Sequence, residues 1–170
     1  MIKTVIGIDP GLHGAAAVIT GGIPGIYDTP TLKAENGFQK KKKNGKRVKK
    51  YKNVYSVPAM VRILSPYKDC AHVFLEKIHA MPGQGTASMF TMGEGYGLWQ
   101  GIITALGMPL TLVTPQTWKK AMMEGMTKGK DASILRAGQL YPDLVEVFAK
   151  HHDRAESLLI AEYGRRELGL

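Results

Sequence analysis

Apolar residues gather in short runs along this chain, and two of the runs end at a single acidic residue. Residues 4–8 are mainly β-branched and small, and Asp9 follows them directly. Pro10 and Gly11 then stop the run, as expected of a turn. The pattern predicts a buried strand that presents Asp9 at its carboxyl end, where open α/β sheets bind their ligands. A simpler interpretation is that Asp9 only caps the turn.

Four further apolar runs extend this strand into a sheet. Residues 14–20 and 23–29 flank Gly21-Gly22, a pair typical of a hairpin turn, and predict three antiparallel strands in succession. Residues 71–75 are continuously apolar, as in a central strand, and lead directly to Glu76. Glu76 either points to water beside Lys77 or shares a site with Asp9. The repetition of an acid after a buried strand favours the shared site. Residues 110–113 predict a last short strand.

Helical periodicity follows in several segments. Ser56 is a candidate N-cap for the first helix. The final helix carries Asp153 and Glu156, three positions apart, on one face of its first turn. Acidic residues there also suit the helix dipole, which is a purely structural explanation. Helices are predicted over about 58–64, 88–106, 117–123, 131–140 and 151–163.

The long helix predicted over 88–106 contains Gly93, Gly97, Gly101 and Ala105, one small residue every four positions. Each glycine costs a helix up to about 1 kcal/mol relative to alanine, so close packing is needed to compensate. We expect this bare face to pack on the sheet or on a neighbouring helix. A subunit interface is the alternative.

Positive charge is confined to one segment. The net charge is +9, from 23 basic and 14 acidic residues. Nine of the basic residues lie between positions 40 and 52, and without them 14 basic residues face 14 acidic ones. We interpret residues 33–54 as a basic insertion, either a β-ribbon or disordered. Such a segment binds phosphate polymers in a salt-dependent way, so nucleic acid is the expected partner. Its candidate DNA-binding residues are Lys41, Lys42, Lys43, Lys46, Arg47, Lys49 and Lys50.

Length and composition are those of a single globular domain over residues 1–170. No apolar run approaches the length of a membrane span, and we expect no membrane partner and no secretory signal. The single cysteine, Cys70, excludes an internal disulfide framework and fits a reducing compartment.

Four carboxylates form the candidate site, namely Asp9, Glu76, Asp153 and Glu156. The apolar positions of the final helix predict that it packs on the core, which turns its acids toward the strand ends. Gathered together, the four groups would raise one another's pKa. Mg²⁺ or Mn²⁺ would remove that repulsion, because both prefer oxygen ligands. Two such ions can stabilise the attacking and leaving oxygens of a phosphoryl displacement.

Other site chemistries find less support in the sequence. Zinc is disfavoured by the single cysteine and by the absence of a histidine pair at the usual spacing. The sequence contains no P-loop or dinucleotide fingerprint, so no organic cofactor is expected. His152 could assist proton transfer beside Asp153, although such histidines more often lie on the surface. We interpret Trp118 as a core residue.

Five motifs then suggest a family. They are Ile-Gly-Ile-Asp-Pro-Gly at 6–11, Phe-Leu-Glu-Lys at 74–77, Thr-Pro-Gln-Thr-Trp-Lys-Lys at 114–120, Lys-Asp-Ala-Ser at 130–133 and Asp-Arg-Ala-Glu-Ser-Leu-Leu-Ile-Ala at 153–161. In order and spacing they resemble RuvC-type Holliday-junction resolvases, especially the bacteriophage type. The resemblance covers nearly the whole chain except the basic insertion.

The resemblance implies an α/β, RNase H-like fold, with a mixed five-stranded sheet flanked by helices. It implies a homodimer, with two Mg²⁺ or Mn²⁺ ions in each active site. Asp9 would bridge the metals, Glu76 would be a second ligand, and Asp153 and Glu156 would be the pair on the final helix. Lys119 and Lys130 match family lysines near the scissile phosphate, although both could be ordinary solvated lysines.

By this resemblance we expect an endodeoxyribonuclease that cuts four-way and other branched DNA by in-line attack of water. It would act in the cytoplasm, that of the bacterial host if a phage encodes it. Two alternatives stay open at this point, a related nuclease acting on flaps or RNA–DNA hybrids and a non-catalytic junction-binding protein. A third, an actin-like ATPase, is disfavoured because its fold needs two such domains and 170 residues are too few.

Overall fold

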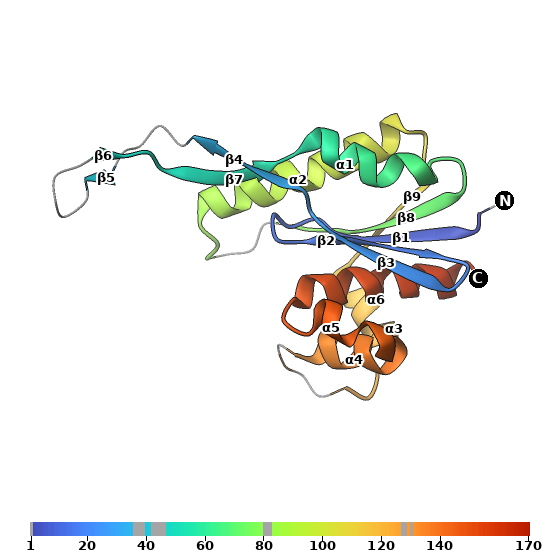
Figure 1. Cartoon of the computed structure of the whole chain (residues 1–170). Helices are drawn as coiled ribbons and strands as arrows, with labels where there is room; N and C mark the ends of the chain where they lie inside the picture. Colours follow the sequence, from blue (N-terminus) through green and yellow to red (C-terminus); the bar gives the residue numbers. More distant parts are fainter. Residues whose placement is uncertain (1, 36–39, 42–46, 80–82, 127–128, 130) are drawn as a thin grey trace.

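A mixed five-stranded sheet forms the centre of the molecule (Figure 1). The computed structural model describes residues 2–35, 40–41, 47–79, 83–126, 129 and 131–170. β1 pairs antiparallel with β2 and parallel with β8, which confirms the predicted mixed sheet. From one edge to the other, the strands are β3 (Ile23–Asp28), β2 (Ala15–Thr20), β1 (Thr4–Asp9), β8 (Ala71–Glu76) and β9 (Leu110–Val113).

Helices cover both faces of this sheet and create two separate hydrophobic cores (Figure 1). One face carries α1 (Val57–Leu64) and α2 (Thr86–Ala105), joined to the sheet through a core around Trp99. The other face carries α3 (Pro115–Met122), α4 (Ala132–Leu140), α5 (Val145–Phe148) and α6 (His152–Glu167), with a core around Trp118. Two 3₁₀ turns, Ser65–Tyr67 and Pro142–Leu144, complete the described elements.

Several boundaries differ from the sequence prediction. The second strand begins at Ala15, because Gly14 belongs to the preceding turn, and the final helix continues to Glu167. Ser56 occupies the N-cap position of α1, but its side chain makes no capping hydrogen bond. The short helix α5 was not predicted, since four residues are too few to show helical periodicity.

The contact between β1 and α6 depends on Gly7 in the middle of β1. A Cβ atom at this position would overlap the backbone of Ala161 and Ser157 in α6. Gly164 plays the same role later in the helix, because a Cβ there would overlap the ring of Phe74 from β8. These two glycines let α6 lie directly on the central strands. The close approach brings the first turn of α6 to the edge of the sheet where β1 and β8 end.

The small-residue face of α2 does not pack as we predicted. Gly93, Gly97 and Gly101 are exposed, and a Cβ at any of the three would meet no described atom within 4 Å. The buried face is instead formed by Gly95, Trp99, Ile102 and Ile103. The prediction that this face packs within the chain was therefore wrong. A period of four residues shows that the small residues share one face of the helix, but it does not show whether that face is turned toward the sheet or toward solvent.

The basic insertion forms a two-stranded ribbon in its described part, as one of the two predicted alternatives. β4 (Thr31–Glu35) pairs antiparallel with β7 (Tyr51–Tyr55), and β5 (Lys40–Lys41) pairs with β6 (Arg47–Val48) farther out. The ribbon extends away from the sheet on the side of α2 (Figure 1). At its base, the hydroxyl of Tyr55 donates to the Thr91 carbonyl of α2 at 3.0 Å, which fixes the ribbon to the body.

No helix in the described part of the chain is both long and apolar enough to cross a membrane.

Candidate active site

Asp9 stands at the carboxyl end of β1, where the chain turns back into β2. Its Oδ1 accepts a long hydrogen bond of 3.4 Å from the N–H of Gly11. The Gly14 N–H closes the turn by donating to the Gly11 carbonyl at 2.9 Å. A Cβ at Gly14 would overlap the Asp9 carbonyl, so the turn requires glycine there. The turn thus holds Asp9 at the edge of the sheet with one oxygen only weakly engaged.

Glu76 reaches the same edge from the neighbouring strand. β8 runs parallel to β1 with Leu75 opposite Ile8, so the residue that follows each partner emerges at the same end of the sheet. Glu76 is buried, and its Oε1 accepts a hydrogen bond of 2.8 Å from the indole Nε1–H of Trp118. The shared site predicted from the two strand-terminal acids is therefore consistent with the geometry.

The first turn of α6 supplies two more carboxylates to this edge. Glu156 forms an ion pair of 3.0 Å with Lys119 Nζ and accepts a hydrogen bond of 2.9 Å from the hydroxyl of Ser133. Asp153 lies 3.0 Å from the Nε2 atom of His152. Because Gly7 brings α6 close to β1, both acids lie near the strand ends.

Electrostatics shows that the four acids act on one another. Burial raises the pKa of Asp9 well above its usual value, and the charges of Glu76, Asp153 and Glu156 raise it further. Burial also raises the pKa of Glu76, an effect that the Trp118 hydrogen bond and Lys119 partly offset. Buried carboxylates that repel one another are costly without compensating positive charge. The cluster is therefore a strong candidate for cation binding.

The donor set fits a hard divalent cation, since every member is a carboxylate oxygen. Among the described residues, however, no three His, Cys, Asp or Glu side chains already converge as a metal-binding group. Glu156 is instead held by Lys119 and by the Ser133 hydroxyl. Binding a metal would require the Glu156 side chain to leave these partners and turn toward Asp9.

Two consecutive residues of α3 contact two different acids of the cluster. Trp118 bonds Glu76 of β8, while Lys119 pairs with Glu156 of α6. The Lys119 ammonium also lies 4.9 Å from the centre of the Trp118 ring. Lys119, which the resemblance places near the scissile phosphate, lies at the acidic edge beside Glu156, and its proposed role there stays a prediction. Trp118 is a core residue, as predicted, but its hydrogen bond to Glu76 was not foreseen.

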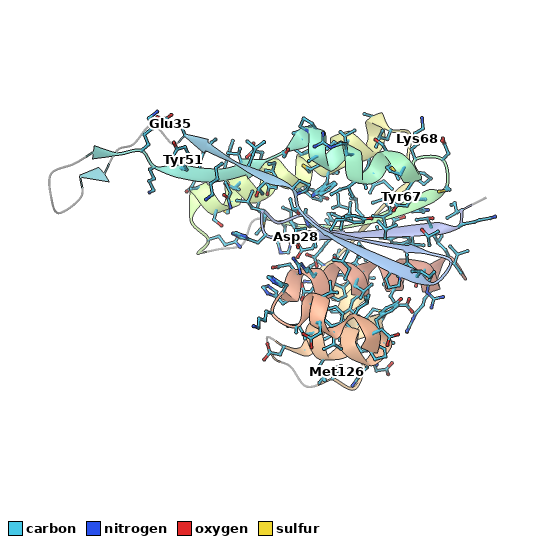
Figure 2. The ribbon with its side chains drawn as sticks, viewed as in Figure 1. Asp28, Glu35, Tyr51, Tyr67, Lys68 and Met126 are labelled. Carbon is cyan, nitrogen blue, oxygen red and sulfur yellow. The ribbon has the colours of Figure 1, made fainter. Side chains whose placement is uncertain are left out.

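A cavity of about 950 Å³ opens beside Glu156, between α3, α4 and the start of α6. Lys119, Lys150 and His152 contribute its basic and polar lining, while Met123 and Ile134 contribute apolar lining. Met126 also lines this cavity, and it lies at the far end of the helical layer from the sheet (Figure 2). This side of the acidic edge is therefore open.

A smaller cavity of about 330 Å³ lies at the base of the ribbon, lined in part by His13, Lys52 and Tyr55. Burial and the charges of Glu94 and Asp9 raise the pKa of Tyr55 to about 12. The ribbon therefore joins the body close to the turn that follows Asp9.

The described part of the ribbon is basic and exposed. Lys33, Lys49, Lys50 and Lys52 all face solvent, and Lys49 forms an exposed ion pair of 3.0 Å with Glu35. Figure 2 shows Glu35 and Tyr51 on the ribbon, away from the sheet. Lys41 and Arg47 belong to β5 and β6. The candidate residues that lie outside the described part of the chain are Lys42, Lys43, Lys46 and Lys130.

Sequence reasoning missed the residues that hold the acids in place. Arg154, between the two acids of α6, makes two bonds of 2.6 Å to the carboxylate of Asp28 at the end of β3. It also donates to the Val147 carbonyl at 2.7 Å. Asp28 lies where β3 ends beside the helical layer (Figure 2). These contacts join residues remote in sequence, and only the Asp-Arg-Ala-Glu motif itself hinted that Arg154 belongs to the site.

The mixed five-stranded sheet with helices on both faces is the RNase H-like fold that the sequence predicted, and solved structures of this fold match the chain. The chain superimposes on Thermus thermophilus RuvC in complex with a Holliday junction substrate with a TM-score of 0.59 and 13% identity, over 98% of this chain and 96% of that chain. A second Thermus thermophilus RuvC structure gives a TM-score of 0.53 and 15% identity, with the same coverage. At these identities the comparison establishes the fold.

Sequence comparison finds a relative in the green alga Chlamydomonas reinhardtii, the chloroplastic Holliday junction resolvase MOC1. The two are 32% identical over 92 residues, which is 53% of this chain and 10% of the relative. The matched region thus spans about a tenth of that longer protein. No family model matches the chain.

Proposed function

We propose that this protein is a metal-dependent endonuclease that cuts four-way and other branched DNA junctions. The observation that carries the proposal is the half-buried Asp9 carboxylate, whose pKa is raised by the charges of three other acids, at the edge of a RuvC-like sheet. The matched segment of a named Holliday junction resolvase supports the same substrate class. A DNA-binding protein without metal chemistry would gain nothing from an acidic cluster, because it repels phosphates.

In this proposal Asp9, Glu76, Asp153 and Glu156 hold two Mg²⁺ or Mn²⁺ ions. Bound ions of this kind supply the positive charge that lets carboxylates and a phosphate share one site, and they activate water for attack on phosphorus. Lys119 already faces the acidic edge, so its ammonium can neutralise the phosphate once Glu156 turns away. Lys130 is proposed to act beside it. The products would carry 5′-phosphate and 3′-hydroxyl ends.

The ribbon is proposed to hold one arm of the DNA. Lys33, Lys49, Lys50 and Lys52 are exposed, and the base of the ribbon lies next to the turn that follows Asp9. Negative phosphates bound along the ribbon would therefore lead toward the acidic edge. The candidate contacts are Lys41, Lys42, Lys43, Lys46, Arg47, Lys49 and Lys50.

A homodimer would place two such sites on one four-way junction. The exposed face of α2 supports this part of the proposal, since Gly93, Gly97 and Gly101 leave room for close approach of a second helix. Phe90, 74% exposed, lies on the same helix near this face. Close packing between two copies would recover the helix stability that exposed glycines sacrifice.

The decisive experiment compares cleavage of a labelled four-way junction in Mg²⁺ and in EDTA, with a linear duplex and an RNA–DNA hybrid of the same sequence as alternative substrates. Asp9→Asn should abolish cleavage and retain junction binding, because it removes the carboxylate on which the charges of the other three acids act. Asp69→Asn is the matched control, since Asp69 is exposed and precedes the opposite end of β8. Full activity of Asp9→Asn would refute the proposal, and a preference for the hybrid would redirect it to another nuclease class.

A further inference from the structure

Two tryptophans lie fully buried on opposite faces of the sheet, and they differ in whether the indole N–H has a hydrogen-bond partner. Trp118 of α3 and Trp99 of α2 both have 0% exposure. The indole Nε1–H of Trp118 donates to Glu76 at 2.8 Å. The Nε1 atom of Trp99 is buried and has no hydrogen-bond partner among the described residues. This fold therefore accommodates a buried indole N–H without a partner, so stability alone does not require the bond at Trp118.

The position of Trp118 is tightly determined by the β9–α3 connection. Val113, the last residue of β9, pairs with Glu76, and its carbonyl accepts a 2.7 Å hydrogen bond from the Lys77 N–H. The side chain of Thr114 then caps α3 by accepting from the Thr117 N–H at 3.2 Å. The chain thus leaves β9 beside Glu76, and the first turn of α3 brings the Trp118 indole back to the same glutamate.

We propose that Trp118 is a positioning residue, whose indole N–H fixes one oxygen of the Glu76 carboxylate and so leaves the other oxygen oriented to hold a divalent cation. The inference rests on the metal site of the proposed function. Residues outside a metal's own ligands commonly orient ligating carboxylates in this way, and losing one typically costs 10- to 100-fold in metal affinity or activity.

The fold itself offers a matched pair of variants, Trp118→Phe and Trp99→Phe. Each removes one indole from a fully buried position, so both should lower the melting temperature through lost packing. Only Trp118→Phe should also raise the Mn²⁺ dissociation constant, measured by calorimetry without DNA, by roughly 10- to 100-fold. The Mg²⁺ concentration for half-maximal cleavage should rise in parallel. In Trp99→Phe both values should stay within about twofold of wild type.

A second variant separates the N–H group from the volume of the ring. Incorporation of 3-benzothienylalanine at position 118 replaces the indole N–H with sulfur and keeps the bicyclic shape. It should reproduce the weakened Mn²⁺ binding with a nearly unchanged melting temperature, which a packing role would not do. It also serves as the test if Trp118→Phe does not fold.

Trp99→Phe provides an independent optical readout, because the chain contains two tryptophans. In this variant Trp118 is the sole tryptophan, and its emission should change on addition of Mg²⁺. Wild-type Mn²⁺ affinity in the benzothienylalanine protein would overturn the inference. If the wild-type protein binds Mn²⁺ but cuts no junction, the proposed function fails, while the affinity comparison still decides the role of Trp118.

Discussion

The two faces of the sheet use glycine in opposite ways. Where α6 meets the sheet, Gly7 of β1 is covered by the backbone of α6, and Gly164 of α6 is covered by the ring of Phe74. Because neither glycine has a side chain, the helix can lie directly on the strands. On α2, Gly93, Gly97 and Gly101 face outward with open space beside them. The first arrangement places carboxylates at the sheet edge within one chain. The second lowers the stability of a helix without compensating packing among the described residues, which is why we propose the face of α2 as the dimer interface.

The largest effect is expected where glycine is covered. Gly7→Ala inserts a Cβ into the backbone of α6, which must move away from the sheet. We expect destabilisation of at least about 3 kcal/mol, at the upper end for overpacked cores, together with loss of cleavage. Urea unfolding and the junction assay measure the two effects. A stable and active Gly7→Ala protein would contradict the close packing of β1 and α6.

A smaller loss of stability is expected from removing the charge of Glu162, which lies in the last third of α6 and accepts hydrogen bonds from three neighbouring side chains. Glu162 is buried, with bonds from Arg165, Arg166 and the Tyr141 hydroxyl. Although burial acts in the other direction, these partners lower the pKa of Glu162 from 4.5 to about 2. Glu162→Gln should cost about 2 kcal/mol, because both arginines are partly solvent-screened.

The pH dependence of this contribution follows from the direction of the Glu162 pKa shift. A lowered pKa in the folded state adds stability that is complete above about 4.5 and disappears as the pH falls toward 2. Wild-type and Glu162→Gln unfolding free energies should therefore converge between pH 4.5 and 2. A difference that stays constant over this range would show that the charge of Glu162 contributes nothing.

The smallest effect should have the opposite sign, on α2. Gly97→Ala places a methyl group in open space on a helix, so the monomer should gain about 0.5–1 kcal/mol. The same methyl group should weaken self-association if two α2 helices meet there. Sedimentation at several concentrations measures the second effect. Stabilisation with unchanged association would remove the glycine face from the proposed dimer interface.

The sheet and its acidic edge were predictable from sequence because each depends on a local pattern. An apolar run followed by an acid predicts a strand and the end at which its carboxylate emerges, and this holds for Asp9 and Glu76. The basic insertion was less predictable, since its strands contain few apolar residues. Its pairing became evident only in the register of Thr31 with Tyr55.

The contacts that organise the acids were not predictable, because they join positions distant in sequence. Trp118 and Glu76 are 42 positions apart, and a tryptophan in an apolar helix suggests only burial. The outward face of α2 was predicted wrongly for a related reason. Spacing shows that Gly93 and Gly97 share a face, but the sheet selects the face that contains Trp99, whose burial removes far more apolar surface from water.

The ribbon is fixed to the body at its base, so the length of its outer part can change without moving that base. Tyr55 fixes the base of the ribbon to α2, and a Cβ at Gly95 would overlap both the Tyr55 ring and the Pro10 carbonyl. The outer strands β5 and β6 lie away from the five-stranded sheet (Figure 1), so residues can be added or removed there in pairs. Each pair changes the span of the arm by about 3.4 Å without moving the base. Under the proposed function, the length of DNA that the ribbon holds and the position at which it is cut can therefore evolve separately.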